Sequence, residues 1–282
     1  MRDIILALGC SFTDPNFYCD DPSAKHLPEN LKGGWPMWPE IFTERLSKKD
    51  NVEYKLINRG QSASSMEYSS IEFFSNWTKN KDRLKAVLWG GTQLDRVDHL
   101  YHEYPFHLGW LADIPEERKR TMDMTAMKDF GMYEYMHWLA SETANSKIYV
   151  RQSKIWLNRL IGIRDLCEAH GVHFIYYPLL SFFTTDTYKN VGGRDTRIDQ
   201  KLTMLYILGG AGEAYEEITT SKNWIGVSSL LEGWNSWRRK YNMKGYTIGE
   251  NKEYPNLDAH PNEEGQICIA DEFWSHYEKN FT

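Results

Sequence analysis

The sequence lacks three features that would assign it to common classes of protein. Its four cysteines never occur in a CxxC spacing, which argues against a disulfide framework and a structural zinc site. No apolar run approaches the roughly 18 residues that a membrane-spanning helix needs. The formal net charge of −6 provides no electrostatic basis for binding a polyanion. We therefore expect a globular chain that spans no membrane and binds no nucleic acid.

The first residues also lack the pattern of a secretion signal. MRD offers one arginine offset by one aspartate, and the apolar stretch after it is shorter than the roughly 7–15 residues that export requires. Cys10 and Cys268 lie in apolar contexts that are typical of buried free thiols. We therefore expect a cytoplasmic protein, or one released without a signal peptide.

Aromatic side chains, in contrast, are abundant: they make up 14% of the chain and include eleven tryptophans. Aromatic faces stack against sugar rings and flat apolar ligands, and the alternative is that these rings fill a core. A length of 282 residues suits one large α/β domain with insertions or two smaller domains.

Short apolar runs are separated by long connections, a pattern typical of a parallel sheet covered by helices on both faces. The predicted strands are Ile4–Leu8, Tyr54–Asn58, Ala86–Trp89, Val172–Tyr177 and Trp224–Val227. The predicted helices include Ser153–His170, which Gly171 ends, and Asn262–Lys279, which follows Pro261.

Two connections, 97–150 and 181–222, are too long for simple links between a strand and a helix. Each contains a helical pattern of its own, over Glu134–Ser141 and Asp199–Leu208. Because neither has an evident linker, we expect both to be insertions that form helical caps over the strand ends. The whole chain, residues 1–282, is then one domain.

Four polar turns lie at positions where an α/β sheet places its chemistry. The first strand runs into GCSFT, which places Ser11 at the carboxyl end of a strand. NRGQSASS supplies Gly60, GGTQLDR supplies Gln93, and NLDAHPNEEG places Asp258 two residues before His260. Turns on one edge of a sheet converge even when they are far apart in sequence. The alternative for Ser11 is an ordinary N-cap or turn serine.

These residues are the parts that acyl transfer requires. A serine hydroxyl is a weak nucleophile until a base removes its proton, and His260 is the candidate base for Ser11. Asp258 is expected to orient the imidazole, because residues i and i+2 of an extended segment face the same way. The backbone N–H groups of Ser11 and Gly60, with the Gln93 amide, would supply three donors to the developing oxyanion.

The blocks GCSF, NRGQS, GGTQ and DAHPNEEG, in this order, resemble the sequence blocks of the SGNH, or GDSL-like, hydrolase family. The resemblance implies a three-layer α/β/α sandwich with a parallel five-stranded, flavodoxin-like sheet. It also implies the roles argued above, with Ser11, His260 and Asp258 as the catalytic residues and Ser11, Gly60 and Gln93 as the oxyanion hole.

Three positions depart from the family pattern. Cys10 stands where the family usually has aspartate, which leaves the nucleophile unchanged. Gln93 replaces the usual asparagine and is one methylene longer. The usual position of the acid, three residues before the histidine, is Leu257. Asp258 is the nearest replacement, and Asn256 or a backbone carbonyl is the alternative partner for the imidazole.

The stretch VDHLYHEYPFHLGW is rich in histidine and aromatic residues. No cysteine or regular carboxylate spacing accompanies its histidines, so we expect no metal at His99, His102 and His107. The aromatic neighbours instead predict a lining for a substrate, with the candidates Tyr101, Tyr104 and Trp110.

The sequence thus predicts a serine esterase that needs no cofactor and removes acyl groups, acetyl above all, from a carbohydrate or another small polar ester. One alternative is a non-catalytic carbohydrate-binding or structural module on the same scaffold, for which Gln93 and the shifted aspartate would be early signs of lost activity. The other alternative is a lipase or thioesterase that acts on long acyl chains.

Overall fold

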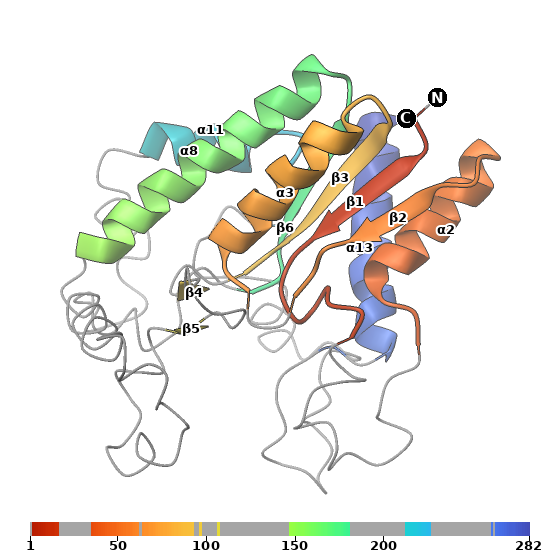
Figure 1. Cartoon of the computed structure of the whole chain (residues 1–282), viewed down its shortest axis with the longest axis horizontal. Coiled ribbons are helices and arrows are strands. Elements are labelled where there is room, and N and C mark those ends of the chain that lie inside the picture. The colour runs from red at the N-terminus through yellow and green to blue at the C-terminus, as the bar shows by residue number, and fades with distance from the viewer. Residues whose placement is uncertain are drawn as a thin grey trace, which may run out of the picture.

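A parallel four-stranded sheet forms the centre of the protein (Figure 1). The computed structural model describes residues 2–16, 35–61, 64–92, 96–97, 106–107, 147–180, 212–226, 261 and 263–282. The strands are β1 (Ile4–Leu8), β2 (Lys55–Asn58), β3 (Leu84–Gly91) and β6 (His173–Pro178), in the order β2-β1-β3-β6. This order is that of a flavodoxin-like sheet, and it confirms the predicted α/β class.

The predicted fifth strand is reduced to a single bridge among the described residues. Tyr176 of β6 pairs in parallel with Trp224. The Tyr176 N–H donates to the Asn223 carbonyl over 2.7 Å, and the Ile225 N–H donates to the Tyr176 carbonyl over 2.9 Å. Gly226, the last described residue of this segment, takes a φ of 98°, outside the extended region. The fifth strand predicted over Trp224–Val227 is therefore not confirmed beyond this bridge, and Val227 lies outside the described residues.

Helices cover both faces of the sheet, because successive side chains of each strand point to opposite faces. Ile4, Leu6 and Leu8 of β1 belong to one buried cluster, and Ile5 belongs to the other. The first cluster includes side chains of α3 (Met66–Asn80), α8 (Lys147–Ala169) and α11 (Gly212–Thr219); the second includes side chains of α2 (Trp38–Asp50) and α13 (Glu263–Phe281). In Figure 1, α3 and α8 lie in front of the sheet and α13 lies behind it. This arrangement confirms the three-layer α/β/α sandwich.

Part of the aromatic richness belongs to this core. Trp38 of α2 stacks on Phe273 of α13 with ring centroids 4.2 Å apart, and Trp89 of β3 meets Trp156 of α8 at 5.0 Å. Five of the eleven tryptophans are buried in the described core, namely Trp38, Trp77, Trp89, Trp156 and Trp224. These five rings are therefore not available to stack on a ligand.

The helix α8 has the predicted end and an earlier start. It begins at Lys147, inside the first predicted insertion, rather than at Ser153. At its other end Gly171 takes a φ of 62°, and the Val172 N–H donates back to the Cys167 carbonyl over 2.8 Å. A glycine in the left-handed region is the usual way to close a helix, so the sequence located this end correctly.

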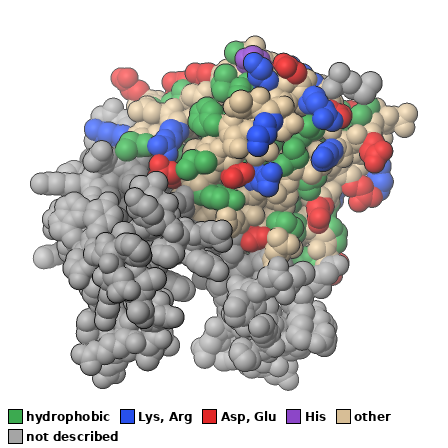
Figure 2. Space-filling model, viewed as in Figure 1, with side chains coloured by type: hydrophobic (Ala, Val, Ile, Leu, Met, Phe, Trp, Pro, Cys, Tyr) green, Lys and Arg blue, Asp and Glu red, His purple; other side chains and the backbone are tan. Residues whose placement is uncertain are grey.

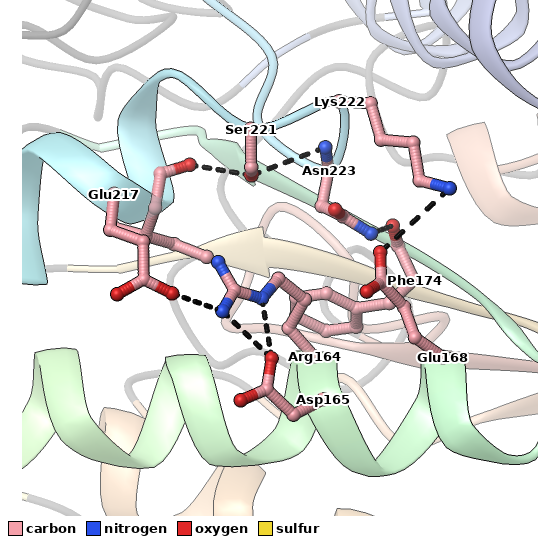
Figure 3. Close-up of polar contacts among 9 residues, drawn as sticks. Arg164, Asp165, Glu168, Phe174, Glu217, Ser221, Lys222 and Asn223 are labelled. Atoms are coloured by element: carbon pink, nitrogen blue, oxygen red, sulfur yellow. Dashed lines mark hydrogen bonds and ion pairs between the residues drawn. The ribbon is translucent and has the colours of Figure 1, made fainter.

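The second predicted insertion contains α11, which packs on α8 as part of the main body. Ile218 of α11 is fully buried in the first core cluster. The buried Arg164 of α8 pairs with Glu217 of α11 and with its own neighbour Asp165, as Figure 3 shows. At the start of the first insertion, β4 (Arg96–Val97) forms an antiparallel pair with β5 (Phe106–His107). The helical patterns at 134–141 and 199–208 lie outside the described residues.

The described surface in Figure 2 carries acidic and basic side chains close to one another. Two glutamates of α3 form such pairs: Glu72 with Arg59 at 3.4 Å and Glu67 with Arg159 at 3.4 Å. Exposed ion pairs of this kind contribute about 0–1 kcal/mol each to the free energy of unfolding.

None of the helices within the described ranges is long and apolar enough to cross a membrane.

His173, at the amino end of β6, should make stability depend on pH. Burial first, and then the charges of Lys85, Lys222 and Arg2, lower the pKa of His173 from 6.5 to about 4. Between these two pH values the unfolded chain binds a proton at His173 that the folded chain does not bind. The free energy of unfolding is therefore unaffected by this group above pH 6.5 and decreases as the pH drops towards 4. We expect His173→Gln to flatten this fall in urea unfolding. An unchanged pH dependence in the variant would contradict the assignment.

Candidate active site

The candidate site is built around the turn Gly9–Asp14, here called the Ser11 turn, at the carboxyl end of β1. Backbone N–H groups of Thr13 and Asp14 both donate to the Cys10 carbonyl, over 2.8 and 3.0 Å. The strand order reverses between β1 and β3, and ligands of open α/β sheets bind in the crevice outside such a reversal. Ser11 therefore lies where this fold offers a site.

Gly9 brings the turn against the neighbouring strand. Its φ is 154°, and a Cβ there would lie 2.9 Å from the Gly90 carbonyl oxygen. Gly90 and Gly91 themselves belong to β3, which extends two residues beyond the predicted strand. The GGT segment therefore begins as paired strand, because Gly90 and Gly91 pair with Tyr177 and Pro178 of β6.

The loop after β2 is hydrogen-bonded to the Ser11 turn. The Gln61 N–H and the Ser64 hydroxyl both donate to the Gly9 carbonyl, over 3.0 and 2.9 Å. A Cβ on Gly60 would lie 2.6 Å from the Thr13 carbonyl carbon, so only glycine allows this approach. The structure thus brings together the turns that contain Ser11 and Gly60.

Asn58, the last residue of β2, joins these two turns with its side chain. Its Oδ1 accepts from the Gly60 N–H over 2.9 Å, and its Nδ2 donates to the Thr13 carbonyl over 2.8 Å. An oxyanion that uses the Gly60 N–H would therefore share this donor with Asn58.

The first turn of α13 reaches the same place from the other end of the chain. Gln266 is fully buried, and its Nε2 donates to the Phe12 carbonyl over 3.4 Å. Its Oε1 accepts from the N–H of Trp38, the first residue of α2, over 3.0 Å. Gln266 follows His260 by six positions in the chain.

Ser11 is almost completely buried. Only 3% of the residue is exposed. Thr13, in the same turn, and Thr92, next to Gln93, are fully buried. Inside such a dry environment, a fixed backbone donor interacts more strongly with a developing charge than it does in water.

The other predicted site residues lie outside the described residues: Gln93, Asp258, His260, Asn256, Leu257, Tyr101, Tyr104, Trp110, His99 and His102. Pro261, the neighbour of His260, is described and buried. His107 belongs to β5. Within the described part of the chain, no group of three or more His, Cys, Asp or Glu side chains is arranged to hold a metal ion.

Sequence reasoning missed two residues of this junction, Asn58 and Gln266. Asn58 had a usable signal, since an asparagine two positions before a glycine often accepts from a backbone N–H in an Asx turn. Gln266 had none, because its partners are 228 and 254 positions away in the chain.

Comparisons with known proteins find similarity in three-dimensional structure. The sequence matches no protein-family model and no curated protein. Among solved structures, the chain is similar to TesA, with 11% identity and a TM-score of 0.43 over 99% of this chain and 100% of TesA. It is similar to the psychrotrophic esterase EstA from Pseudoalteromonas sp., with 11% identity and a TM-score of 0.42 over 99% and 98% of the two chains. It is also similar to Axe2, an acetylxylan esterase from Geobacillus stearothermophilus, with 13% identity and a TM-score of 0.42 over 97% and 93%.

Proposed function

We propose that this protein is an ester hydrolase of the SGNH type that uses Ser11 as its nucleophile. The observation that carries the proposal is the position of the Ser11 turn, at the reversal of strand order between β1 and β3 and in contact with the Gly60 loop. The contact of Gln266 with Phe12 supports a place for His260 near this turn. Six residues span at most about 20 Å, and the helical start of α13 shortens that reach.

In the proposed reaction, His260 accepts the Ser11 proton as the serine oxygen attacks the ester carbonyl carbon. The carbonyl oxygen becomes an oxyanion that accepts hydrogen bonds from the Ser11 and Gly60 N–H groups and the Gln93 amide. The protonated His260 then gives its proton to the departing alcohol, which leaves an acyl-serine. Water, deprotonated by His260, hydrolyses this intermediate, and Asp258 holds the imidazole throughout.

For the substrate we propose a short acyl group, acetyl above all, on a carbohydrate or another polar alcohol. The carbohydrate part rests on the aromatic residues Tyr101, Tyr104 and Trp110.

A panel of p-nitrophenyl esters, from acetate to palmitate, tests this proposal together with labelling by a fluorophosphonate. We expect hydrolysis to be fastest with the shortest chains, and mass spectrometry to find the label on Ser11. A preference for long chains would favour a lipase or thioesterase. Hydrolysis of no ester would favour a non-catalytic module, and a label on another serine would overturn the site.

Gln93→Ala should lower kcat by about 10²–10³ if the side-chain amide donates to the oxyanion. The loss should appear in kcat rather than in KM, because the charge develops only in the transition state. The Gln93→Asn variant restores the family's usual residue and serves as the comparison. An unchanged kcat in Gln93→Ala would leave the backbone donors of Ser11 and Gly60 as the oxyanion hole.

A further inference from the structure

Two carboxamide side chains hold consecutive carbonyl groups of the Ser11 turn. The Gln266 amide donates to the Phe12 carbonyl over 3.4 Å, and the Asn58 amide donates to the Thr13 carbonyl over 2.8 Å. These are the two residues that follow Ser11 directly. The carboxamides come from segments far apart in the sequence, since Asn58 ends β2 and Gln266 lies in the first turn of α13.

Each carboxamide also binds a second segment through its oxygen. Asn58 accepts from the Gly60 N–H over 2.9 Å, and Gln266 accepts from the Trp38 N–H, at the start of α2, over 3.0 Å. Gln266 is fully buried, so a lost hydrogen bond there would not be replaced by bulk water. Each side chain therefore joins the Ser11 turn to another segment of the site.

We propose that Asn58 and Gln266 are positioning residues that orient the Ser11 hydroxyl relative to the other groups of the reaction. The inference rests on the proposed function. Asn58 sets the distance between the Ser11 turn and the Gly60 loop, and Gln266 sets the distance between the Ser11 turn and the helix that follows His260. A displacement of about 1 Å in such a site can cost 10²-fold in rate, so these contacts should act on kcat.

The test replaces the N–H donor of each carboxamide by a carboxyl oxygen. Gln266→Glu and Asn58→Asp keep an oxygen for Trp38 and Gly60 and place a second oxygen against the carbonyl of the turn. Asn223→Asp is the matched control, because Asn223 is 1% exposed and donates to the Phe174 carbonyl over 2.9 Å at the β6 edge (Figure 3). We measure kcat and KM on the shortest reactive ester at about pH 8, where histidine is neutral. Each kcat is calculated from the concentration of folded protein.

We expect kcat to fall by about tenfold or more in Gln266→Glu and Asn58→Asp, with KM within about threefold of the wild type. Labelling of Ser11 by the fluorophosphonate should slow in parallel. Asn223→Asp should lower the melting temperature without this loss of kcat. As the pH falls and the new carboxyl group takes a proton, its O–H replaces the lost donor, so the ratio of variant to wild-type kcat should rise. In Gln266→Met, which offers no such donor, the ratio should stay flat.

Variants that lose stability but keep the wild-type kcat, as the control does, would overturn the positioning role and leave the proposed function intact. The positioning role is also wrong if the ratio of variant to wild-type kcat depends on pH in the same way for Gln266→Glu and Gln266→Met. A folded wild-type protein that hydrolyses no ester, or whose activity survives Ser11→Ala, would instead overturn the proposed function and this inference together.

Discussion

Ser11→Ala should abolish ester hydrolysis, with a loss in kcat on the order of 10⁴ to 10⁶. The methyl group of alanine cannot form the acyl intermediate, and the remaining donors can only stabilise attack by water. His260→Ala should cause a loss of the same order, because the serine proton then has no acceptor. The double variant should lose little more than either single variant, since residues that act as one unit are not additive. Steady-state kinetics on a short p-nitrophenyl ester measure all three.

Two control variants separate chemistry from folding. Ser70→Ala removes a buried hydroxyl that donates to the Met66 carbonyl within α3, over 2.9 Å. His276→Ala removes a histidine at the far end of α13, where its Nε2 lies 2.6 Å from the Lys222 carbonyl oxygen. Both controls should keep their activity. If Ser11→Ala or His260→Ala retains more than about a tenth of the wild-type kcat, the proposed mechanism is wrong.

Asp258→Asn should lower kcat by about 10⁴, because an amide in place of the carboxylate favours the wrong tautomer of the base. The side chains are nearly equal in size, so folding should be unaffected and the loss should appear in kcat. This result tests whether the acid can stand two positions before the histidine, as Asp258 does before His260. The usual acid of the SGNH family precedes the histidine by three positions.

Asn256→Ala and Leu257→Asp complete this series. If Asp258 is the partner, Asn256→Ala should keep the activity, and Leu257→Asp introduced into Asp258→Asn should restore part of it by supplying a carboxylate at the usual position. An Asp258→Asn variant that keeps most of its activity would reduce the site to Ser11 and His260, with a backbone carbonyl or Asn256 holding the imidazole.

Local sequence was sufficient to predict the elements whose cause is local. The β1 strand has the predicted bounds, Ile4–Leu8, because an uninterrupted apolar run ended by a glycine suits a strand buried on both faces. The end of α8 was predictable because Gly171 tolerates the left-handed conformation that closes a helix. The placement of Ser11 at the end of β1 follows from the same kind of information.

Contacts between distant segments were decided only by the tertiary structure. Nothing near Gln266 in the sequence indicates that it binds Phe12, 254 positions away, because that contact depends on how α13 packs across the sheet. The fifth strand was predicted from an apolar run, and the described residues confirm only one bridge of it, between Trp224 and Tyr176 of β6. Backbone dihedral preferences and hydrophobic periodicity act over a few residues, so the local sequence determines the helices and strands of this protein. The packing of these helices and strands determines which side chains contact the Ser11 turn.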